Sequence, residues 1–576
     1  MARYTSEKNI LILIDLLKQH GVKNIIASPG TTNISFVASV QSDPFFKMVS
    51  CVDERSAAYM ACGMAAETGE PVVLTCTGAT ASRNYAPGLT EAFYRKLPVI
   101  AVTATQHLGR VGQNAPQVLD RSQQFADMVK KSVQLTAVHT SEDAWACNLV
   151  VNDVILESMR RGGGPVHINM VTTYSNDFSV NELPRVRKIE RVTYDDEMPE
   201  IPSPEVAIFV GAHRRFNNKL TQQVEEFCEK YNGVVLCDHP SGYHGKYKVL
   251  PNLITMQPAA GEFRKIKFLI DLGEVSGIYA ALEPEMVWRV SEDGDIKDTF
   301  KTMTKIFEMN ELDFFRRMNE RKTSKTETGY YDKWRKKFDA LNEKVDMEKL
   351  PFSNPWIARQ MAPRLRDGEK AHLGILNSLR SWDLCEILVD VDFYSNTGGF
   401  GIDGVMSTAL GNALMTKQVT YCFVGDLAFF YDLNSIGNKN VPKNLRILLV
   451  NNGCGTEFHN FNHRAVTVSR ENDLSPEYFA ADGHFGNKSA ELVRHYATDL
   501  GFKYLSARNK EEFLANLDEF TDKSMTQPVI FEVFTDSDDE SEALEMIYGM
   551  EQDAKSFAKK MLGTKGKKIV KRMLGK

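Results

Sequence analysis

Short apolar runs alternate with helix-length segments through the first third of the chain. Three such runs are "NIIASPG" (24–30), "PVVLTCTG" (71–78) and "LPVIAVTAT" (97–105). The segment "SAAYMACGMAAETG", rich in small residues, lies between the first two and has the length of a helix that ends at Gly69. Buried strands that alternate with helices form parallel sheets with helices on both faces. This region therefore predicts a doubly wound α/β domain.

The same alternation returns twice further along the chain. Two segments interrupt it, a polar stretch with several prolines at 180–204 and a highly charged stretch at 312–350. The apolar runs after the first are "EVAIFVGA", "NGVVLCDHP", "KFLIDLGE" and "MVWRVSEDG", and those after the second are "AHLGILNS", "VTYCFVGD", "LRILLVNN" and "PVIFEVFTD". The pattern predicts three parallel-sheet domains and a basic tail, with boundaries at 1–185, 200–345, 350–548 and 549–576.

Composition excludes several classes of protein. A chain of 576 residues is long for one core, and three domains fit its length. The net charge of −6 argues against a nucleic-acid partner, since such proteins are usually basic. The nine cysteines show no CxxC spacing and are expected to be reduced thiols. No run reaches the length of a membrane span, and the N-terminus has no cleavable apolar block, so we expect a soluble cytoplasmic protein.

Two polar residues follow two of the strands predicted in the third domain. Asp426 ends "VTYCFVGD" and Asn452 ends "LRILLVNN", with glycines beside both. Ligands of open α/β sheets bind beyond the carboxyl ends of the strands, and oxygen donors of this kind suit Mg²⁺. One carboxylate would hold Mg²⁺ weakly, so a diphosphate is the expected additional ligand. The plainer alternative is that both residues only form turns.

The segment "VGDLAFFYDLNSIGNKNVPKNLRILLVNNGCG" resembles the metal motif of the thiamine-diphosphate (ThDP) enzymes. That motif is GDG, about 25 residues and then NN, and this chain has Leu427 at its third position. The resemblance implies that Asp426, Asn452 and the carbonyl of Cys454 hold Mg²⁺ against the cofactor diphosphate. It also implies cofactor contacts for Gly425, Leu427 and Ala428.

The resemblance extends to the rest of the cofactor site. In "CVDERSAAYMACGMA", Glu54 takes the place of the family's glutamate, which serves N1′ of the aminopyrimidine, although a glutamate at a helix start can also merely stabilise the helix dipole. The resemblance places Gln117 opposite the reacting carbon, Ile402 beneath the bent cofactor, and Asn377 and Ser378 near the diphosphate or the substrate. It further implies pyrimidine-binding, middle and diphosphate-binding domains, and a homodimer or homotetramer with active sites between chains.

Within the family, the chain resembles the SEPHCHC (2-succinyl-5-enolpyruvyl-6-hydroxy-3-cyclohexene-1-carboxylate) synthases along nearly its whole length. "VDERSAAYMACGMA", "YSNTGGFGIDGVMSTALGNAL" and "GDLAFFYDLNSI" carry this resemblance. Those synthases bind 2-oxoglutarate and isochorismate through cationic side chains. The corresponding positions here hold Thr32, Ile278, Tyr279, Trp382 and Thr397. Each charge-assisted pair is worth about 1.5–3 kcal/mol, so we expect the substrate to differ although the cofactor residues are kept.

The remaining polar residues of these segments suggest what the altered pocket binds. Candidates for substrate contact are Thr32, His107, Arg110, Arg380, Glu457 and His459, with Arg83 the weakest. Each could equally be a surface or supporting residue. With few cations, the pocket suits a small pyruvate-like 2-oxo acid.

Three functions remain open. The sequence favours a decarboxylating carbon–carbon lyase or ligase (carboligase) that uses ThDP and Mg²⁺ and transfers an acyl carbanion to a carbonyl acceptor, with a keto sugar among the candidates. One alternative is a SEPHCHC synthase with a rebuilt pocket, and another is a non-catalytic ThDP-binding scaffold. The lysine-rich tail predicts an amphipathic helix, for which solvation or folding onto the acidic "DSDDESE" is favoured over membrane contact.

Overall fold

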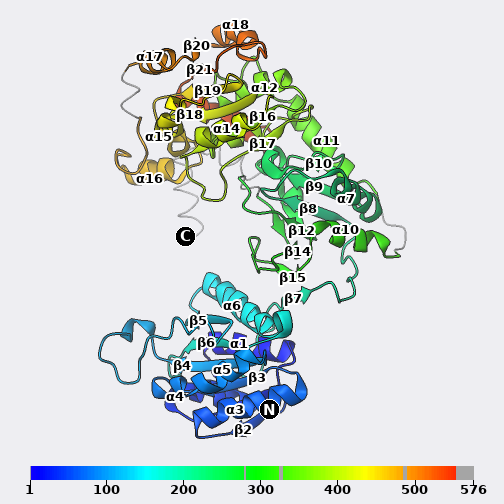
Figure 1. Ribbon diagram of the computed structural model, residues 1–576, viewed down its shortest axis with the longest axis vertical. Helices are drawn as coiled ribbons and strands as arrows, with labels where there is room; N and C mark the ends of the chain where they lie inside the picture. Colours follow the sequence, from blue (N-terminus) through cyan, green and yellow to red (C-terminus); the bar gives the residue numbers. More distant parts are fainter. Residues whose placement is uncertain (1, 278–280, 323–327, 484–488, 553–576) are drawn as a thin grey trace, which may run out of the picture. The chain divides into compact units, whose positions relative to one another are not determined.

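The computed structural model describes residues 2–277, 281–322, 328–483 and 489–552. Residue contacts divide it into two units, 1–193 with 294–308 (unit 1) and 194–293 with 309–576 (unit 2). Figure 1 shows parallel sheets flanked by helices in both units. The predicted α/β class is confirmed.

Unit 1 contains a six-stranded sheet in the order β2-β1-β3-β4-β6-β5, and every pairing in it is parallel. Its strands are β1 Asn24–Ala27, β2 Lys47–Ser50, β3 Val72–Cys76, β4 Val99–Thr105, β5 Lys131–Leu135 and β6 Val166–Val171. Its α-helices are α1 Lys8–Gln19, α2 Ile34–Gln41, α3 Glu54–Thr68, α4 Thr80–Asn84, α5 Ala86–Tyr94 and α6 Ser141–Met159. Two further strands, β7 Glu190–Val192 and β15 Met303–Phe307, pair in parallel.

Successive side chains of these strands enter two separate cores. Ile25, Val73 and Ile100 pack with α1 and α6, whereas Ile26 and Leu74 pack with α3 and α5. Side chains alternate across a strand, so strands that are apolar at every position must be covered on both faces. That is why the apolar runs of the sequence are continuous.

Unit 2 contains two parallel sheets and a short parallel pair of strands. The first has the order β10-β9-β8-β12-β14, with β8 Val206–Val210, β9 Gly233–Cys237, β10 Lys248–Val249, β12 Leu269–Leu272 and β14 Val287–Val290. The second has the order β17-β16-β18-β19-β21-β20, with β16 Lys370–Leu373, β17 Asp392–Tyr394, β18 Thr420–Gly425, β19 Leu445–Asn451, β20 Lys503–Ala507 and β21 Val529–Phe534. A short parallel pair joins β11 Lys265–Ile266 to β13 Glu283–Pro284.

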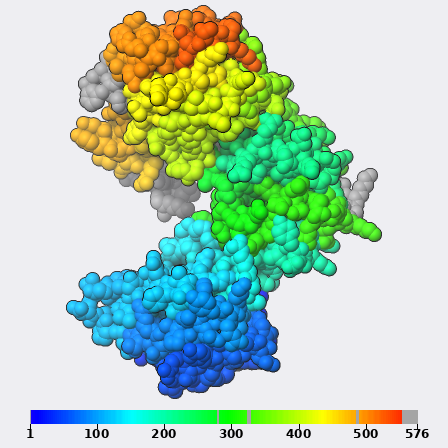
Figure 2. Space-filling model, in the orientation of Figure 1, coloured from blue at the N-terminus to red at the C-terminus, as the bar shows by residue number. Residues whose placement is uncertain are grey.

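Helices cover these sheets, and within unit 2 the segments coloured green and yellow form one continuous surface (Figure 2). The helices that accompany the first sheet are α7 Asn218–Tyr231, α8 Asn252–Thr255, α9 Gly261–Arg264, α10 Glu311–Glu320 and α11 Tyr330–Glu343. Those that accompany the second are α12 Asn354–Met361, α13 Asn377–Trp382, α14 Val405–Leu414, α15 Asp426–Tyr431, α16 Arg464–Asn472, α17 Leu492–Asp499, α18 Lys510–Phe520 and α19 Ser537–Tyr548. Most of the predicted middle domain (200–345) and the predicted third domain (350–548) lie in unit 2, whereas residues 294–308 of the middle domain belong to unit 1.

No helix in the described ranges is long and apolar enough to cross a membrane. The predicted amphipathic tail lies outside the described residues from 553 onward, as do Ile278 and Tyr279.

A buried pair of acids joins the two sheets of unit 2. Asp238 follows β9 and Asp383 follows α13, and both carboxyls are buried. Asp383 Oδ1 accepts the backbone N–H of His239 at 3.1 Å. Burial raises the pKa of Asp238 to about 6, and burial together with the nearby Asp238 carboxyl raises the pKa of Asp383 well above its usual value. Burial therefore shifts both carboxyls toward their protonated forms.

We expect unit 2 to lose stability as the pH rises, because a carboxyl with a raised pKa in the folded state stabilises only while it is protonated. That contribution is complete below about pH 4 and is lost as the pH passes through about 6 and above. Asp383→Asn removes one buried charge and should raise the melting temperature at pH 8 by several degrees, with little change at pH 5. Thermal unfolding followed by circular dichroism at both pH values tests this, with the exposed Asp499→Asn as control. An equal effect at both pH values would contradict the assignment.

Candidate functional site

Asp426 and Asn452 lie at the carboxyl ends of two neighbouring strands. β18 pairs in parallel with β19, with Gly425 opposite Val450. Asp426 is the first residue of α15 and is only 2% exposed, whereas Asn452 directly follows β19. The polarity pattern of the sequence therefore locates both strand ends correctly.

The carboxylate of Asp426 connects the two turns that follow these strands. Its Oδ1 accepts the N–H of Leu427 and its Oδ2 accepts the N–H of Gly453, each at 2.8 Å. Gly453 has a φ of 77°, a conformation that glycine adopts without strain. Asn452 Oδ1 accepts the N–H of Cys454 at 3.4 Å, and the carbonyl of Cys454 accepts the N–H of Thr456 at 3.0 Å. Two turns 27 residues apart are thereby held as one structure.

This donor set fits a magnesium ion shared with a diphosphate. It consists of one carboxylate, one amide oxygen and one carbonyl, which are the hard oxygen ligands that Mg²⁺ takes. A Cβ added to Gly425 would meet no atom within 4 Å, so there is open space beside the strand end. In the described ranges, no three His, Cys, Asp or Glu side chains are grouped to hold a metal. A metal at Asp426 would therefore need further oxygens from a ligand.

Three predicted residues meet at the start of α13. The guanidinium of Arg380 donates to both carboxylate oxygens of Glu457, at 2.6 and 3.0 Å, and to Asn377 Oδ1 at 3.0 Å. Asn460, which the sequence interpretation missed, donates to Asn377 at 3.1 Å and to Glu457 at 3.2 Å. Ser378 is buried beside them in α13. The charge of Arg380 is thus matched by Glu457.

Arg380 and Glu457 line a cavity of about 250 Å³ together with Tyr548. His459 does not line that cavity. It lies with Phe458 beside α16, in a separate cavity of about 230 Å³. The structure thus brings Arg380 and Glu457 together and places His459 elsewhere.

The residue predicted to contact the aminopyrimidine, Glu54, lies in unit 1 at the start of a helix. Glu54 is the first residue of α3, directly after Asp53, whose side chain accepts the N–H of Ser56 at 3.1 Å. Glu54 is half-buried, and its Oε2 accepts a hydrogen bond from Asn84 at 3.4 Å. Because Asp53 already caps the helix, Glu54 is not needed as the cap.

Gln117 lies where a loop passes close to the end of β3. Its φ is 62°, which is rare for a residue other than glycine. A Cβ on Gly78 would lie 2.5 Å from the carbonyl of Gln117, so only glycine allows this approach. Backbone strain of this kind is concentrated at functional sites.

The other predicted substrate residues of unit 1 differ in exposure. Thr32 is 5% exposed, and its hydroxyl bonds to Thr77 and donates to the carbonyl of Ala104 at 3.3 Å. His107 is exposed and its Nδ1 accepts the N–H of Gly109 at 3.1 Å. Arg110 is exposed and donates to Gln106 at 2.5 Å. Arg83, the weakest candidate, is also exposed and donates to the carbonyl of Asp120 at 3.2 Å. Thr32 is therefore the buried member of these four residues.

Arg121 is a buried cation near Gln117 that the sequence interpretation missed. It is 1% exposed, and one of its nitrogens donates to the carbonyl of Ala104 at 3.0 Å. Burial lowers its pKa to about 10. It lies in a polar loop, "QVLDRSQQF", where no periodicity distinguishes a buried arginine from an exposed one.

Comparison with known proteins relates this chain to one family of enzymes. Residues 11–124 match the family described as "Thiamine pyrophosphate enzyme, N-terminal TPP binding domain". The 2-succinyl-5-enolpyruvyl-6-hydroxy-3-cyclohexene-1-carboxylate synthase of Phocaeicola vulgatus is 30% identical over 95% of this chain and 98% of its own length. Proteins of the same name from Bacteroides thetaiotaomicron and Bacteroides fragilis are 29% and 28% identical, each over 95% of this chain and 99% of their own length. The chain therefore belongs to the family of thiamine-diphosphate-dependent enzymes that includes the SEPHCHC synthases.

Proposed function

We propose that this enzyme decarboxylates a small pyruvate-like 2-oxo acid and transfers the resulting acyl group to a carbonyl acceptor, with ThDP and Mg²⁺ as cofactors. The proposal is supported by a contrast between the expected cofactor site and the expected substrate site. The turns around Asp426 and Asn452 present oxygen ligands of the kind that Mg²⁺ takes, whereas the positions of the relatives' anion-binding side chains lack cations.

The second half of that contrast rests on three described positions, Thr32, Trp382 and Thr397, and on the ion pair of the nearby Arg380. Thr32 is buried and its hydroxyl is engaged by Thr77. Trp382 is 1% exposed and packs against Phe423 with ring centroids 4.3 Å apart. Thr397 is 3% exposed, and Arg380 is paired with Glu457. None of these described positions offers an unmatched positive charge to a dicarboxylate.

The chain's own residues have distinct proposed roles. Asp426, Asn452 and the carbonyl of Cys454 would bind the metal and through it the diphosphate, and Ile402, which packs against the hydrophobic cluster that includes Ala428, would support the cofactor. Glu54 would hold the proton at N1′ of the aminopyrimidine. Bound ThDP would supply the electron sink for loss of carbon dioxide.

The proposal is tested by pyruvate consumption in the presence of ThDP, Mg²⁺ and a panel of aldehydes and keto sugars. We expect consumption that depends on both cofactors. Glu54→Gln should lower it by about 10²–10⁴-fold, the usual contribution of acid–base catalysis. Absence of turnover with every 2-oxo acid, despite tight cofactor binding, would favour the scaffold alternative.

A SEPHCHC synthase with a rebuilt pocket is the second candidate, and the similarity over 95% of the chain favours it. Because the cationic side chains are absent, we expect no useful turnover of 2-oxoglutarate with isochorismate. Each lost charge-assisted pair should cost about 1.5–3 kcal/mol of binding free energy. Product formation followed by mass spectrometry tests this, and an ordinary enzymatic rate would establish the second candidate.

A further inference from the structure

Unit 2 contains a cavity of about 490 Å³ that is lined by the end of α11, by α12 and by residues 385–389. These segments precede β16 and β17 in the chain, so the cavity lies toward the amino-terminal ends of those strands. The metal motif instead follows the carboxyl ends of β18 and β19, which belong to the same parallel sheet. The cavity therefore lies on the opposite edge of the sheet from Asp426, and its volume is that of a small-molecule site.

Most of the cavity lining is apolar. The apolar side chains are Met347, Ala362, Pro363, Leu388 and Val389. Leu388 is 87% exposed, so this part of the lining can be reached from solvent. Cys385 also lines the cavity, and burial raises the pKa of its thiol to about 12, so the thiol is uncharged at neutral pH.

The cavity also contains a cation without an acidic partner. Nη1 of Arg359 donates to Asn342 Oδ1 at 2.8 Å, and Nη2 donates to the carbonyl of Leu384 at 2.7 Å. Both acceptors are neutral, and Nε is buried without a hydrogen-bond partner. Burial lowers the pKa of Arg359, and no carboxylate in the described part of the chain opposes this shift. A charge in such a place is normally paired.

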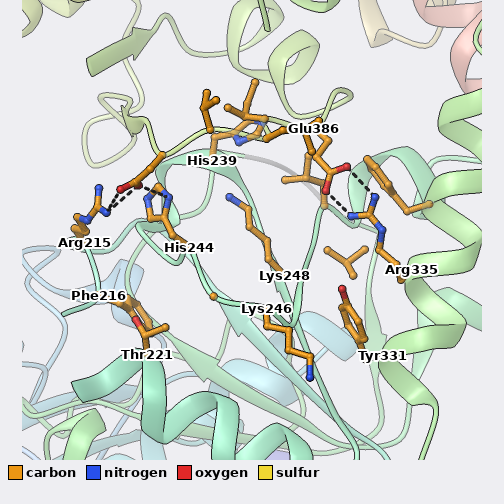
Figure 3. Close-up of a pocket in the computed structure, with 18 of the residues that line it drawn as sticks. Arg215, Phe216, Thr221, His239, His244, Lys246, Lys248, Tyr331, Arg335 and Glu386 are labelled. Atoms are coloured by element: carbon orange, nitrogen blue, oxygen red, sulfur yellow. Dashed lines mark hydrogen bonds and ion pairs between the residues drawn. The ribbon is translucent and has the colours of Figure 1, made fainter. Parts of the chain in front are cut away.

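Glu386 is the carboxylate of this lining, and it is already engaged. Both of its oxygens contact the guanidinium of Arg335, with Nη2 and Oε2 2.8 Å apart (Figure 3). Asp339, which is 43% exposed and lies outside the lining, contacts the same guanidinium. Glu386 also borders the neighbouring pocket that Figure 3 shows. Arg335 thus holds Glu386, whereas no described acid holds Arg359.

We propose that this cavity binds a small monocarboxylate with an apolar body, whose carboxylate contacts Arg359. A guanidinium matches the planar geometry of a carboxylate and forms strong charge-assisted hydrogen bonds with it. A single unmatched cation suits a single negative charge, whereas a phosphate monoester would bring about −1.5 to −2 charges. The apolar body would cover side chains such as Met347 and Val389, which is favourable because both surfaces leave water.

Calorimetry on the holoenzyme, saturated with ThDP and Mg²⁺, tests this proposal. The probes are hexanoate and benzoate, with hexanamide and benzamide as neutral counterparts of the same shape. We expect saturable binding of at least one carboxylate, at least about tenfold tighter than that of its amide, because the amide has no charge to offer Arg359. Inorganic phosphate, an anion without an apolar body, should bind more weakly than that carboxylate.

Variants of the lining show whether the bound probe occupies this cavity. Arg359→Gln should weaken binding of the carboxylate at least about tenfold, whereas Arg359→Lys keeps the charge and should retain most of the affinity. Gln360→Trp adds a large side chain to the lining and should weaken binding with Arg359 intact. The matched control Arg364→Gln removes a 43% exposed arginine outside the lining and should bind like the wild type.

Absence of saturable binding of both carboxylates at millimolar concentration would overturn the proposal. Equal affinity for a carboxylate and its amide, phosphate binding as tight as that of the carboxylates, or undiminished binding by folded Arg359→Gln would overturn it too. Thermal unfolding shows which variants are folded, and Gln360→Trp keeps the test open if Arg359→Gln does not fold. Pyruvate turnover does not enter these readouts, so failure of the proposed function would leave this test unaffected.

Discussion

Asp426→Ala is expected to lower the affinity for ThDP by at least about a hundredfold, or about 2.7 kcal/mol. The substitution removes the carboxylate that would bind the metal. It also leaves the N–H groups of Leu427 and Gly453 without their acceptor, so the two turns lose the contact that holds them together. Asp426→Asn keeps the shape of the side chain but not its charge, and should weaken binding by a smaller factor. Titration calorimetry with ThDP at saturating Mg²⁺ measures both effects.

The matched control is Asp499→Ala, which removes an exposed carboxylate from α17 in the same unit. Its cofactor affinity should equal that of the wild type. A melting temperature close to the wild-type value would show that Asp426→Ala still folds. If the folded Asp426→Ala protein bound ThDP with undiminished affinity, Asp426 would have no part in cofactor binding.

The second large effect is recovery of activity from two inactive variants. We propose that Glu54 of one chain and Asp426 of another serve the same active site of a homodimer or homotetramer. Tyr59 and Met60 of α3 are 49% and 41% exposed, and Tyr94 at the end of α5 is 69% exposed. Apolar groups of this kind on one helix layer are suited to covering by a second chain. A closed two-fold dimer is the expected symmetry.

Mixing Glu54→Gln chains with Asp426→Ala chains, under conditions that exchange subunits, tests this arrangement. Each mixed dimer would have one doubly altered site and one unaltered site, so substantial activity should return. The matched control mixes each variant only with itself, where no activity should appear. Mixed dimers demonstrated by mass spectrometry but lacking activity would place both residues in the site of a single chain.

The residues around the metal motif were predictable because they follow strands. The apolar runs that end at Gly425 and Asn451 specify two buried parallel strands, and parallel strands bring their carboxyl ends to one edge. The positions of Asp426 and Asn452 follow from that rule alone. The α/β class follows in the same way, from continuous apolar runs that must be covered on both faces.

The partners of the candidate substrate residues were not predictable, because they depend on loops. Arg380 and Glu457 are 77 positions apart, and their contact requires the turn after β19 to fold over α13. His459 follows Glu457 by two residues and yet lines a different cavity. Loop conformation also decides the left-handed backbone of Gln117 and the burial of Arg121. The hydrophobic periodicity of the sequence does not predict these loop conformations and contacts.

We propose that Glu54 makes this chain a catalyst and not a scaffold. The exchange of the C2 proton of bound ThDP for deuterium, followed by NMR after rapid quenching, reports that activity without any knowledge of the substrate. The wild type with Mg²⁺ should exchange this proton far faster than free ThDP does. Glu54→Gln should slow the exchange by about 10²–10⁴-fold while still binding the cofactor, and the exposed Glu67→Gln of the same helix should exchange like the wild type. Exchange in the wild type no faster than in free ThDP would contradict the claim.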